Sequence, residues 1–325
     1  MGVTIKDIAK SAGVSYSTVS KALRDSPLVK EPTKKRITEL AKQLGYQPNV
    51  AARSLVSKKS FTIGVVWPTI ERAAHAALIT KLNQKLEQLS YTTLISINEL
   101  EDAVKTFNRY QVDAILAFEE GTGQSSVEAL VPMVTYGIAS RDSTNAVIDA
   151  NRRKAIKAAV EHLIDTGHRH IEYVGAMLES DRLQADKVKG FQEAVSEAKP
   201  LIKAQLNQVS GLEQYDGYAA AKKILQQPDL PTAIVSGSHD LSKGVIRAFH
   251  EQGFSIPEDV SIIGYDNLPQ TEDMEVSLST VGVPLDTIAD ELAKALMAVI
   301  EDKPLDPAIY LEPELTLSSS CRPIS

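Results

Sequence analysis

The chain has 325 residues, of which 43% are hydrophobic and 24% charged, and its formal net charge is −7. It contains no run of eighteen apolar residues and starts with a polar segment, so we expect neither a membrane-spanning helix nor a signal peptide. Its single cysteine, Cys321, excludes an internal disulfide and agrees with a reducing compartment. We therefore expect a soluble, cytoplasmic protein that does not contact a membrane.

Positive charge is concentrated at the N-terminus. The first 60 residues hold twelve Lys or Arg and four acidic residues, a net of +8, whereas the other 265 residues carry −15. A basic head on an acidic body is typical of a protein that contacts DNA at one end only. Charge alone is also compatible with a solvated helical bundle that is basic by chance.

Residues 3–23 have the pattern of two short helices joined by a tight turn. Ile5 and Ile8 begin an apolar stripe at helical spacing, and Gly13 can adopt the turn conformation that residues with a Cβ atom resist. Ser15 is a good N-cap for the second helix. The outer face of that helix has polar side chains suited to base edges and phosphates, namely Tyr16, Ser17, Ser20 and Lys21. The pattern predicts a helix-turn-helix with double-stranded DNA as its partner.

A third helix is predicted for residues 31–44, with Pro32 in its first turn and Gly45 after its end. Residues 49–57 then predict a helix of about two turns, which is too short to be stable alone in water. We expect this last helix to order only against a partner copy and a DNA groove.

Residues 61–325 alternate short apolar runs with amphipathic helical stretches, a pattern that indicates a parallel α/β architecture. A segment of this length is generous for one core, so we expect two lobes with a cleft between them. The predicted strands are 61–66, 92–97, 113–118, 171–174, 232–236 and 260–265, and the predicted helices are 74–90, 152–167, 215–226 and 243–253. The first of these helices has a leucine stripe that we expect in the core: Leu78, Leu82, Leu86 and Leu89. Any disordered tail is expected only in 318–325.

These motifs resemble the lactose-repressor (LacI/GalR) family of bacterial transcription regulators. The resemblance is carried by Val3 to Leu23, Gly45-Tyr46-Gln47-Pro48-Asn49, Ala52-Arg53-Ser54-Leu55, Thr62-Ile63-Gly64-Val65-Val66, Ile256-Pro257-Glu258-Asp259-Val260 and Gly264-Tyr265-Asp266. It implies an N-terminal all-α helix-turn-helix head (1–47), a hinge helix and linker (48–60), and an α/β two-lobed, periplasmic-binding-protein-like body with parallel sheets (61–325). It also implies a sequence-specific DNA-binding transcriptional repressor that works on the nucleoid and binds a palindromic operator as a homodimer.

The resemblance carries DNA-binding roles over to matching positions. Tyr16, Ser17 and Lys21 match positions that read bases, and Lys21 replaces a common Arg, so bidentate reading of guanine weakens. Leu55 matches an apolar wedge that the hinge helix drives into a central base step, with an ordinary core leucine as the alternative. The implied DNA-binding positions are Thr4, Ser15, Tyr16, Ser17, Thr18, Lys21, Asn49, Ala52 and Leu55.

The resemblance also places an effector in the cleft, and here the chain departs from the family pattern. Segment 68–76 has no aromatic residue where family members often have a phenylalanine pair, and Lys187 stands where they have a sugar-binding Arg. Asn151 replaces an expected Asp, and Ser238-His239 replaces an Asn-Asp pair, whereas Asp266 keeps its expected form.

Six polar residues are the expected effector ligands: Glu71, Asn151, Lys187, His239, Asp240 and Asp266. Trp67 or Tyr265 would supply an apolar plate, since a polyol needs convergent polar groups around an apolar wall. We expect a small sugar-like effector other than the common neutral hexoses, such as a modified, amino or phosphorylated sugar.

Signals of enzyme chemistry are weak. Ser238, His239 and Asp240 are consecutive, whereas a catalytic triad converges from separate segments. His168-Arg169-His170 has no further ligand set in the sequence, and Gly121-Thr122-Gly123 lacks the context of a dinucleotide site. We expect no enzyme activity, no cofactor and no metal.

The two rival functions are a sugar-binding transport protein, which would have a signal peptide and no basic head, and an α/β enzyme with an added DNA-binding head.

In the expected mechanism, two copies associate through the acidic body and place two recognition helices in successive major grooves. The effector changes the angle between the lobes and so the cost of ordering the hinges, with a coupling of about 1–3 kcal/mol. The sequence leaves open whether the effector is an inducer or a co-repressor, and whether the protein represses or activates.

Overall fold

The computed structural model describes residues 3–23, 25–46, 59–120, 127, 129–138, 144–177, 181–198, 202–266, 268 and 276–324. The chain divides into two units, Met1–Ser60 and Phe61–Ser325. The expected hinge helix at 49–57, with Asn49, Ala52 and Leu55, lies outside the described residues.

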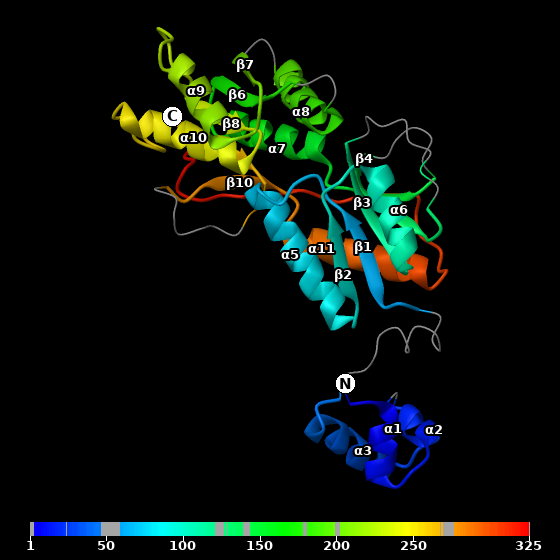
Figure 1. Ribbon diagram of the computed structural model, residues 1–325. Coiled ribbons are helices and arrows are strands. Elements are labelled where there is room, and N and C mark those ends of the chain that lie inside the picture. The colour runs from blue at the N-terminus through cyan, green and yellow to red at the C-terminus, as the bar shows by residue number, and fades with distance from the viewer. Residues whose placement is uncertain are drawn as a thin grey trace. The chain divides into compact units, whose positions relative to one another are not determined.

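Among the described residues of the first unit, three short helices surround one core (Figure 1): α1 (Ile5–Ala12), α2 (Tyr16–Leu23) and α3 (Glu31–Gln43). The predicted helix-turn-helix is confirmed, and α3 ends one residue before its predicted end. Gly13 follows α1 with a φ of 63°, the left-handed conformation that glycine adopts without strain. Ile8, Val19 and Ile37, one from each helix, are fully buried.

The second unit contains two six-stranded sheets, as far as the chain is described. The N-lobe sheet has the order β11-β5-β4-β3-β1-β2, and all neighbouring strands are parallel. Its strands are β1 (Thr62–Val66), β2 (Thr92–Ser96), β3 (Ala114–Glu120), β4 (Met133–Ile138), β5 (Ala146–Asp149) and β11 (Ala308–Tyr310).

The C-lobe sheet has the order β12-β10-β9-β8-β6-β7, in which β12 is antiparallel to β10 and the other neighbours are parallel. Its strands are β6 (His170–Ala176), β7 (Lys203–Val209), β8 (Ala233–Ser236), β9 (Ser261–Tyr265), β10 (Ser279–Gly282) and β12 (Glu314–Thr316). The two sheets confirm the predicted two-lobed, parallel α/β body.

Helices cover both faces of each sheet (Figure 1). In the N-lobe, Val65 packs with the residues of α5 (Ala73–Gln88) and α11 (Leu285–Ile300), whereas Val66 packs with those of α6 (Leu100–Tyr110). This division follows from the alternation of side chains along a strand. In the C-lobe, α7 (Arg152–Asp165) and α8 (Arg182–Ala198) cover one face, and α9 (Gln214–Ile224) and α10 (His239–Glu251) cover the other.

The chain crosses between the two sheets three times within the described residues. It crosses from β5 through α7 to β6, from β10 to α11, and from β11 to β12. Each crossing leaves a strand at its carboxyl end. Because β12 enters from that same edge, it must run antiparallel to β10, with Gly282 opposite Glu314.

Three expectations from sequence need correction. Leu89 ends the predicted leucine stripe but is 46% exposed, because α5 stops at Gln88 and turns away from the core. Helix α10 begins at His239 rather than at 243, because the Ser238 hydroxyl caps it by accepting the Leu241 N–H at 3.2 Å. Residues 318–324 are not a tail: Ser320 is fully buried, and its hydroxyl donates to the Ile262 carbonyl at 2.6 Å.

The sequence predicts no membrane-spanning helix. No helix in the described part of the chain combines the length and apolar character needed to cross a bilayer.

Helices α9 and α10 approach each other closely at Gly244, so a larger residue there should change the free energy of unfolding. A Cβ atom at Gly244 of α10 would lie 2.0 Å from the Gln214 carbonyl oxygen of α9. Gly244→Ala should therefore lower the free energy of unfolding by about 1–3 kcal/mol, although the same change in an exposed helix is stabilising by about 1 kcal/mol. Chemical denaturation measures the effect, with Lys243→Ala, the neighbouring position on the same helix, as the control. Unchanged or higher stability of Gly244→Ala would contradict the close packing.

Candidate functional site

The second helix of the head presents an exposed polar face. Tyr16 is 54% exposed, and Ser17 and Lys21 are also exposed, whereas Val19 and Ala22 on the opposite side are buried. This arrangement leaves the Tyr16 and Lys21 side chains available to an external partner without cost to the core.

Hydrogen bonds fix the first turns of α1 and α2 in the head. The Ser15 hydroxyl accepts the Thr18 N–H at 3.1 Å and lies 2.8 Å from the hydroxyls of both Ser17 and Thr18. At α1, the backbone N–H and the hydroxyl of Thr4 both donate to Asp7 Oδ2, at 2.9 and 2.7 Å, and these bonds lower the pKa of Asp7. Ser15 and Thr4 therefore have capping roles.

In the body, aromatic side chains gather where the N-lobe strands end. Trp67 follows β1, Phe118 lies in β3 and Tyr136 in β4, and His75 lies in the first turn of α5. The Trp67 ring stacks on Tyr136 at 6.0 Å, and its centroid is 5.3 Å from Phe118 and 5.9 Å from His75. These four rings, which we call the aromatic wall, pack together at the carboxyl edge of the sheet, where Trp67 and Tyr136 are buried and Phe118 and His75 are partly exposed.

The C-lobe contributes a buried lysine at its own carboxyl edge. Lys187 of α8 is 2% exposed; its Nζ donates to the Gly237 carbonyl at 2.7 Å and lies 3.9 Å from the Tyr265 ring centroid. Gly237 follows β8 and Tyr265 ends β9, so three elements of the C-lobe meet at this ammonium. Burial lowers the pKa of Lys187 to about 7, against the opposing effect of the Asp266 carboxylate.

An ion pair joins the two lobes where the chain first crosses. Arg152 Nη1 at the start of α7 donates to Asp149 Oδ1 at the end of β5, at 2.9 Å, and both side chains are largely buried. The guanidinium also lies 5.6 Å from the centroid of Tyr136 in the aromatic wall.

Several electrostatic couplings show that these groups converge on one region. Burial lowers the pKa of His75 to about 4, and Arg72, Arg152 and Lys187 lower it further, whereas Asp266 opposes them. Burial also lowers the pKa of His239, which Asp240 and Asp266 oppose. Groups from both lobes therefore lie near one another where the carboxyl edges of the two sheets face each other, and we call this interlobe region the cleft.

Six buried polar atoms around this cleft lack a hydrogen-bond partner among the described residues: Trp67 Nε1, Arg72 Nε, His75 Nδ1, Tyr173 Oη, Gln184 Oε1 and His239 Nδ1. Gln184 lies one turn before Lys187 on α8, and a Cβ atom at Gly237 would lie 2.6 Å from the Tyr173 hydroxyl. Since buried polar groups are nearly always hydrogen-bonded, such a cluster indicates that a polar ligand or ordered water belongs there.

The six residues expected as effector ligands are not all equivalent in the structure. Lys187, His239 and Asp266 are electrostatically coupled within the cleft, and Asp240 acts on His239. Asn151 adopts a φ of 48° immediately before α7 and donates its N–H to Asp149. Glu71 lies exposed in the turn before α5, where its N–H donates to Thr69.

Sequence reasoning missed other residues that line the cleft. Phe118, Tyr136, His75, Arg152 and Tyr173 were not among the expected residues, although Trp67 and Tyr265 were. Phe118 ends a predicted strand of a parallel sheet, and this position was a usable signal, because ligands bind at the carboxyl ends of such strands.

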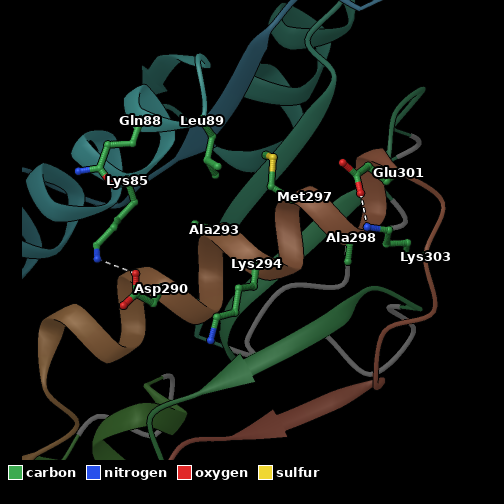
Figure 2. Close-up of a pocket in the computed structure, with 10 residues that line it drawn as sticks. All are labelled: Lys85, Gln88, Leu89, Asp290, Ala293, Lys294, Met297, Ala298, Glu301 and Lys303. Atoms are coloured by element: carbon green, nitrogen blue, oxygen red, sulfur yellow. Dashed lines mark ion pairs between the residues drawn. The ribbon is translucent and has the colours of Figure 1, made fainter.

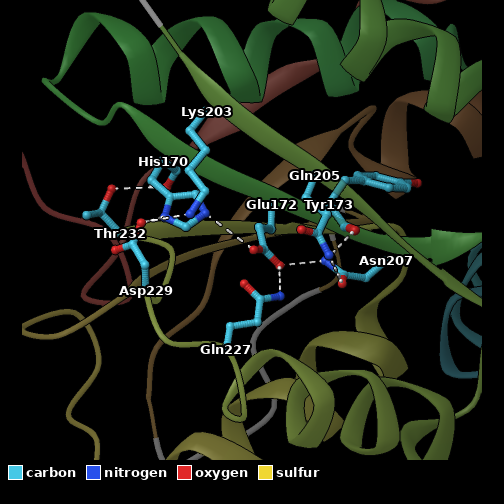
Figure 3. Close-up of polar contacts among 9 residues, drawn as sticks. All are labelled: His170, Glu172, Tyr173, Lys203, Gln205, Asn207, Gln227, Asp229 and Thr232. Carbon is cyan, nitrogen blue, oxygen red and sulfur yellow. Dashed lines mark hydrogen bonds and ion pairs between the residues drawn. The ribbon is translucent and has the colours of Figure 1, made fainter.

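Two other features are less suited to bind an effector. A groove of about 410 Å³ lies between the C-terminal halves of α5 and α11 (Figure 2), but it contains none of the cleft residues. A polar cluster around buried Glu172 (Figure 3) lies near the start of β6, away from the carboxyl edge of the sheet. Asn207 donates to the carboxylate at 2.7 Å and His170 lies 3.4 Å from it, but Glu172 Oε1 and both ring nitrogens of His170 have no hydrogen-bond partner among the described residues. In the described part of the chain, no group of three or more His, Cys, Asp or Glu side chains is arranged to hold a metal ion.

Comparisons with known proteins agree with the division of the chain into a head and a body. Residues 4–49 match the model of bacterial regulatory proteins of the lacI family, and residues 160–321 match that of a periplasmic binding protein-like domain. The chain is 32% identical to catabolite control protein A of Priestia megaterium, over 96% of this chain and 97% of the relative. It is also 32% identical to the probable HTH-type transcriptional repressor ExuR of Bacillus subtilis (strain 168), over 92% of each chain.

A solved structure supports the same fold. The chain is similar to the Lac repressor dimer bound to operator and the anti-inducer ONPF, with a TM-score of 0.83 and 21% identity over 98% of this chain and 99% of that one.

The buried ammonium of Lys187 predicts a specific dependence of stability on pH. Its pKa is about 7 in the folded state and 10.5 as a free side chain, so the unfolded state binds more protons between these values and the stability contributed by this group rises with pH. Lys187→Met should therefore be more stable than the wild type by a few kcal/mol near pH 6, with the difference vanishing towards pH 10.5. Denaturant titrations at each pH measure this, with exposed Lys189→Met as the control. A difference that is the same at every pH would refute it.

Proposed function

Because this chain belongs to the lacI family of bacterial regulatory proteins and is a DNA-binding transcriptional repressor, not an enzyme, we propose that a small molecule between its two lobes controls its affinity for a palindromic operator. The observation that supports this control most directly is the set of unpartnered polar atoms in the cleft of the body. An effector that satisfies them would bind both lobes at once and so hold one angle between them.

The division of labour along the chain is part of the proposal. Residues 1–47 would read DNA, 48–60 would form the hinge, and 61–325 would bind effector and dimerise. In the head, Tyr16, Ser17 and Lys21 would contact bases from the exposed face of α2, which is free of any role in the core. The remaining proposed DNA contacts are Thr4, Ser15, Thr18, Asn49, Ala52 and the Leu55 wedge.

The edge of the N-lobe sheet offers a surface for the second copy. Strand β2 has only β1 as a neighbour in the described sheet, and Ile95 and Ile97 beside this edge are 48% and 61% exposed. Together with exposed Leu89 they form an apolar edge, which we name the β2 edge. A sheet edge with large apolar side chains favours association, because it otherwise exposes both apolar area and unpaired backbone groups.

The effector would be a small sugar-like molecule held between the aromatic wall and the polar groups of the C-lobe. Lys187, His239 and Asp266 would bind it directly, with Asn151 and Asp240 behind them, and Glu71 would join only if its turn moved inward. Closure of the lobes would alter the spacing of the two hinges in a dimer, with a coupling of about 1–3 kcal/mol. Such a protein would work in the cytoplasm, bound to the nucleoid.

Selection from random DNA tests the function. The purified full chain should enrich a palindromic sequence from a pool of random duplexes, and Tyr16→Ala should weaken binding to that sequence by about 1–3 kcal/mol, or roughly 5- to 150-fold. Binding to unrelated duplex should change little, since Tyr16 carries no charge. Exposed Ser11→Ala on α1 is the matched control. Failure to enrich any sequence, with and without metabolite extract, would refute the proposal.

The β2 edge generates a second prediction. Ile95→Lys combined with Ile97→Lys should convert the dimer to a monomer in light scattering and reduce operator affinity by about tenfold or more, because the two half-sites are then bound independently. The thermal midpoint should fall little, since both side chains are exposed. Tyr110→Lys, at an exposed position of α6, serves as the control. A double variant that remains dimeric would show that the copies meet elsewhere.

A further inference from the structure

We propose that the effector carries an anionic group, a carboxylate or a phosphate, which Lys187 and Arg72 bind from opposite lobes. This inference rests on the proposed function, because it concerns the same cleft, and it narrows the effector from sugar-like molecules in general to acidic ones.

The first support is the environment of Lys187. Its ammonium is almost wholly buried, yet its contacts are a neutral carbonyl, that of Gly237, and the ring of Tyr265. Burial raises the pKa of Tyr265, so this ring supplies no full negative charge. Among the described residues, Lys187 forms a hydrogen bond to a carbonyl and a ring contact but no ion pair. A buried charge without an ion partner is costly unless a ligand supplies the opposite charge.

The second support comes from the N-lobe side of the cleft. Arg72 precedes α5, its Nε is buried without a partner, and no ion pair to it is present in the described part of the chain. Arg72 lowers the pKa of both His75 and Lys187, so its charge lies near theirs. Two unpaired cations thus approach one space from different lobes.

The third support is the chemistry of the unpartnered atoms. Trp67 Nε1 and Arg72 Nε can only donate hydrogen bonds, as can the ammonium of Lys187. Carboxylate and phosphate oxygens only accept, and charge-assisted bonds to them are about twice as strong as neutral ones. These three donors are therefore better matched by an anionic group than by a hydroxyl, whereas Gln184 Oε1, which only accepts, is matched by a hydroxyl of the same ligand.

The acidic side chains of the region do not already neutralise these cations by contact. Asp149 is occupied by Arg152 and by the Asn151 N–H, and Asp181 accepts the Gln184 N–H at 3.1 Å. Burial and the negative charge of Asp181 both raise the pKa of Glu120. Asp266 favours the charged form of Lys187 but forms no ion pair with it. Asp266 would accept hydroxyls of the same ligand, whose ring would lie on the aromatic wall.

Isothermal titration of the full chain tests the proposal with matched probes: glucose, glucuronate and glucose 6-phosphate, with inorganic phosphate as the minimal anion and chloride at equal ionic strength as the blank. At least one anion should bind about tenfold or more tightly than glucose. Lys187→Met and Arg72→Gln should each weaken that anion about tenfold or more, whereas Lys187→Arg should retain most of the binding. Lys189→Met, exposed on the same helix, should bind like the wild type.

Proton uptake gives a second readout. An anion beside Lys187 should raise its pKa from about 7 towards its ordinary value, so binding at pH 8 should take up protons, seen as a binding heat that depends on the ionisation enthalpy of the buffer. Lys187→Met should show no such uptake.

Three outcomes would overturn the proposal: glucose binding as tightly as every anion, no anion binding to the wild type, or equal anion binding by the wild type and Lys187→Met. Operator selection on the same preparation separates the two hypotheses. A protein that selects an operator but binds no anion refutes only the acidic effector. A protein that binds the anion through Lys187 but selects no DNA sequence refutes the proposed function and supports the site.

Discussion

The structure depends on one geometric constraint: every described crossing between the lobes leaves a parallel strand at its carboxyl end. The carboxyl edges of both sheets are therefore held against one another, and side chains there meet partners from the other lobe. The Arg152–Asp149 ion pair and the coupling of His75 to Lys187 are direct results. The antiparallel direction of β12 has the same origin, since a strand that arrives from the crossing edge must run away from it. The cleft is thus a product of chain topology before any ligand is considered.

That topology also concentrates polar atoms that the protein itself does not satisfy. Many buried polar groups of the body find partners: Ser320 joins strands through its hydroxyl, and the Ser242 hydroxyl donates to the Ser238 carbonyl. Thr93, His170 and Glu172 also keep buried atoms without partners. In the cleft, Trp67, Tyr173 and Gln184 retain buried atoms without partners. Such groups reduce the stability of the free protein, and the reduction becomes binding energy when a ligand arrives. Among the described residues, six of the ten such atoms lie in the cleft.

Sequence reasoning predicted the elements with strong local signals and missed those that depend on tertiary contacts. The turn at Gly13 and the cap at Ser15 are local signals, and the two helices that they join, α1 and α2, were placed correctly. The strands that end at Val66 and Tyr265 were found because each is a short apolar run. The short strands β5, β10, β11 and β12 were not predicted, because three or four residues carry little periodicity. The longer elements β4, β7, α6, α8 and α11 were not predicted either. Of the cleft residues, Lys187 and Asp266 came from family resemblance, Phe118 lies at the end of a predicted strand and could have been found from it, and Tyr136 required the sheet order. Leu89 was misplaced, because a stripe does not reveal where its helix stops.

Residues 308–324 contribute to both lobes. Strand β11 closes the N-lobe sheet beside β5, β12 closes the C-lobe sheet beside β10, and Ile324 donates its N–H to the Thr166 carbonyl at 2.9 Å. A polypeptide still emerging from the ribosome has its head and most of its strands but neither closing strand. The two sheets of the body cannot be completed until residues 308–316 have been made, whereas the three-helix head, whose core is local in sequence, can fold earlier in translation. During that interval a nascent copy would have a reading head without a finished sensor.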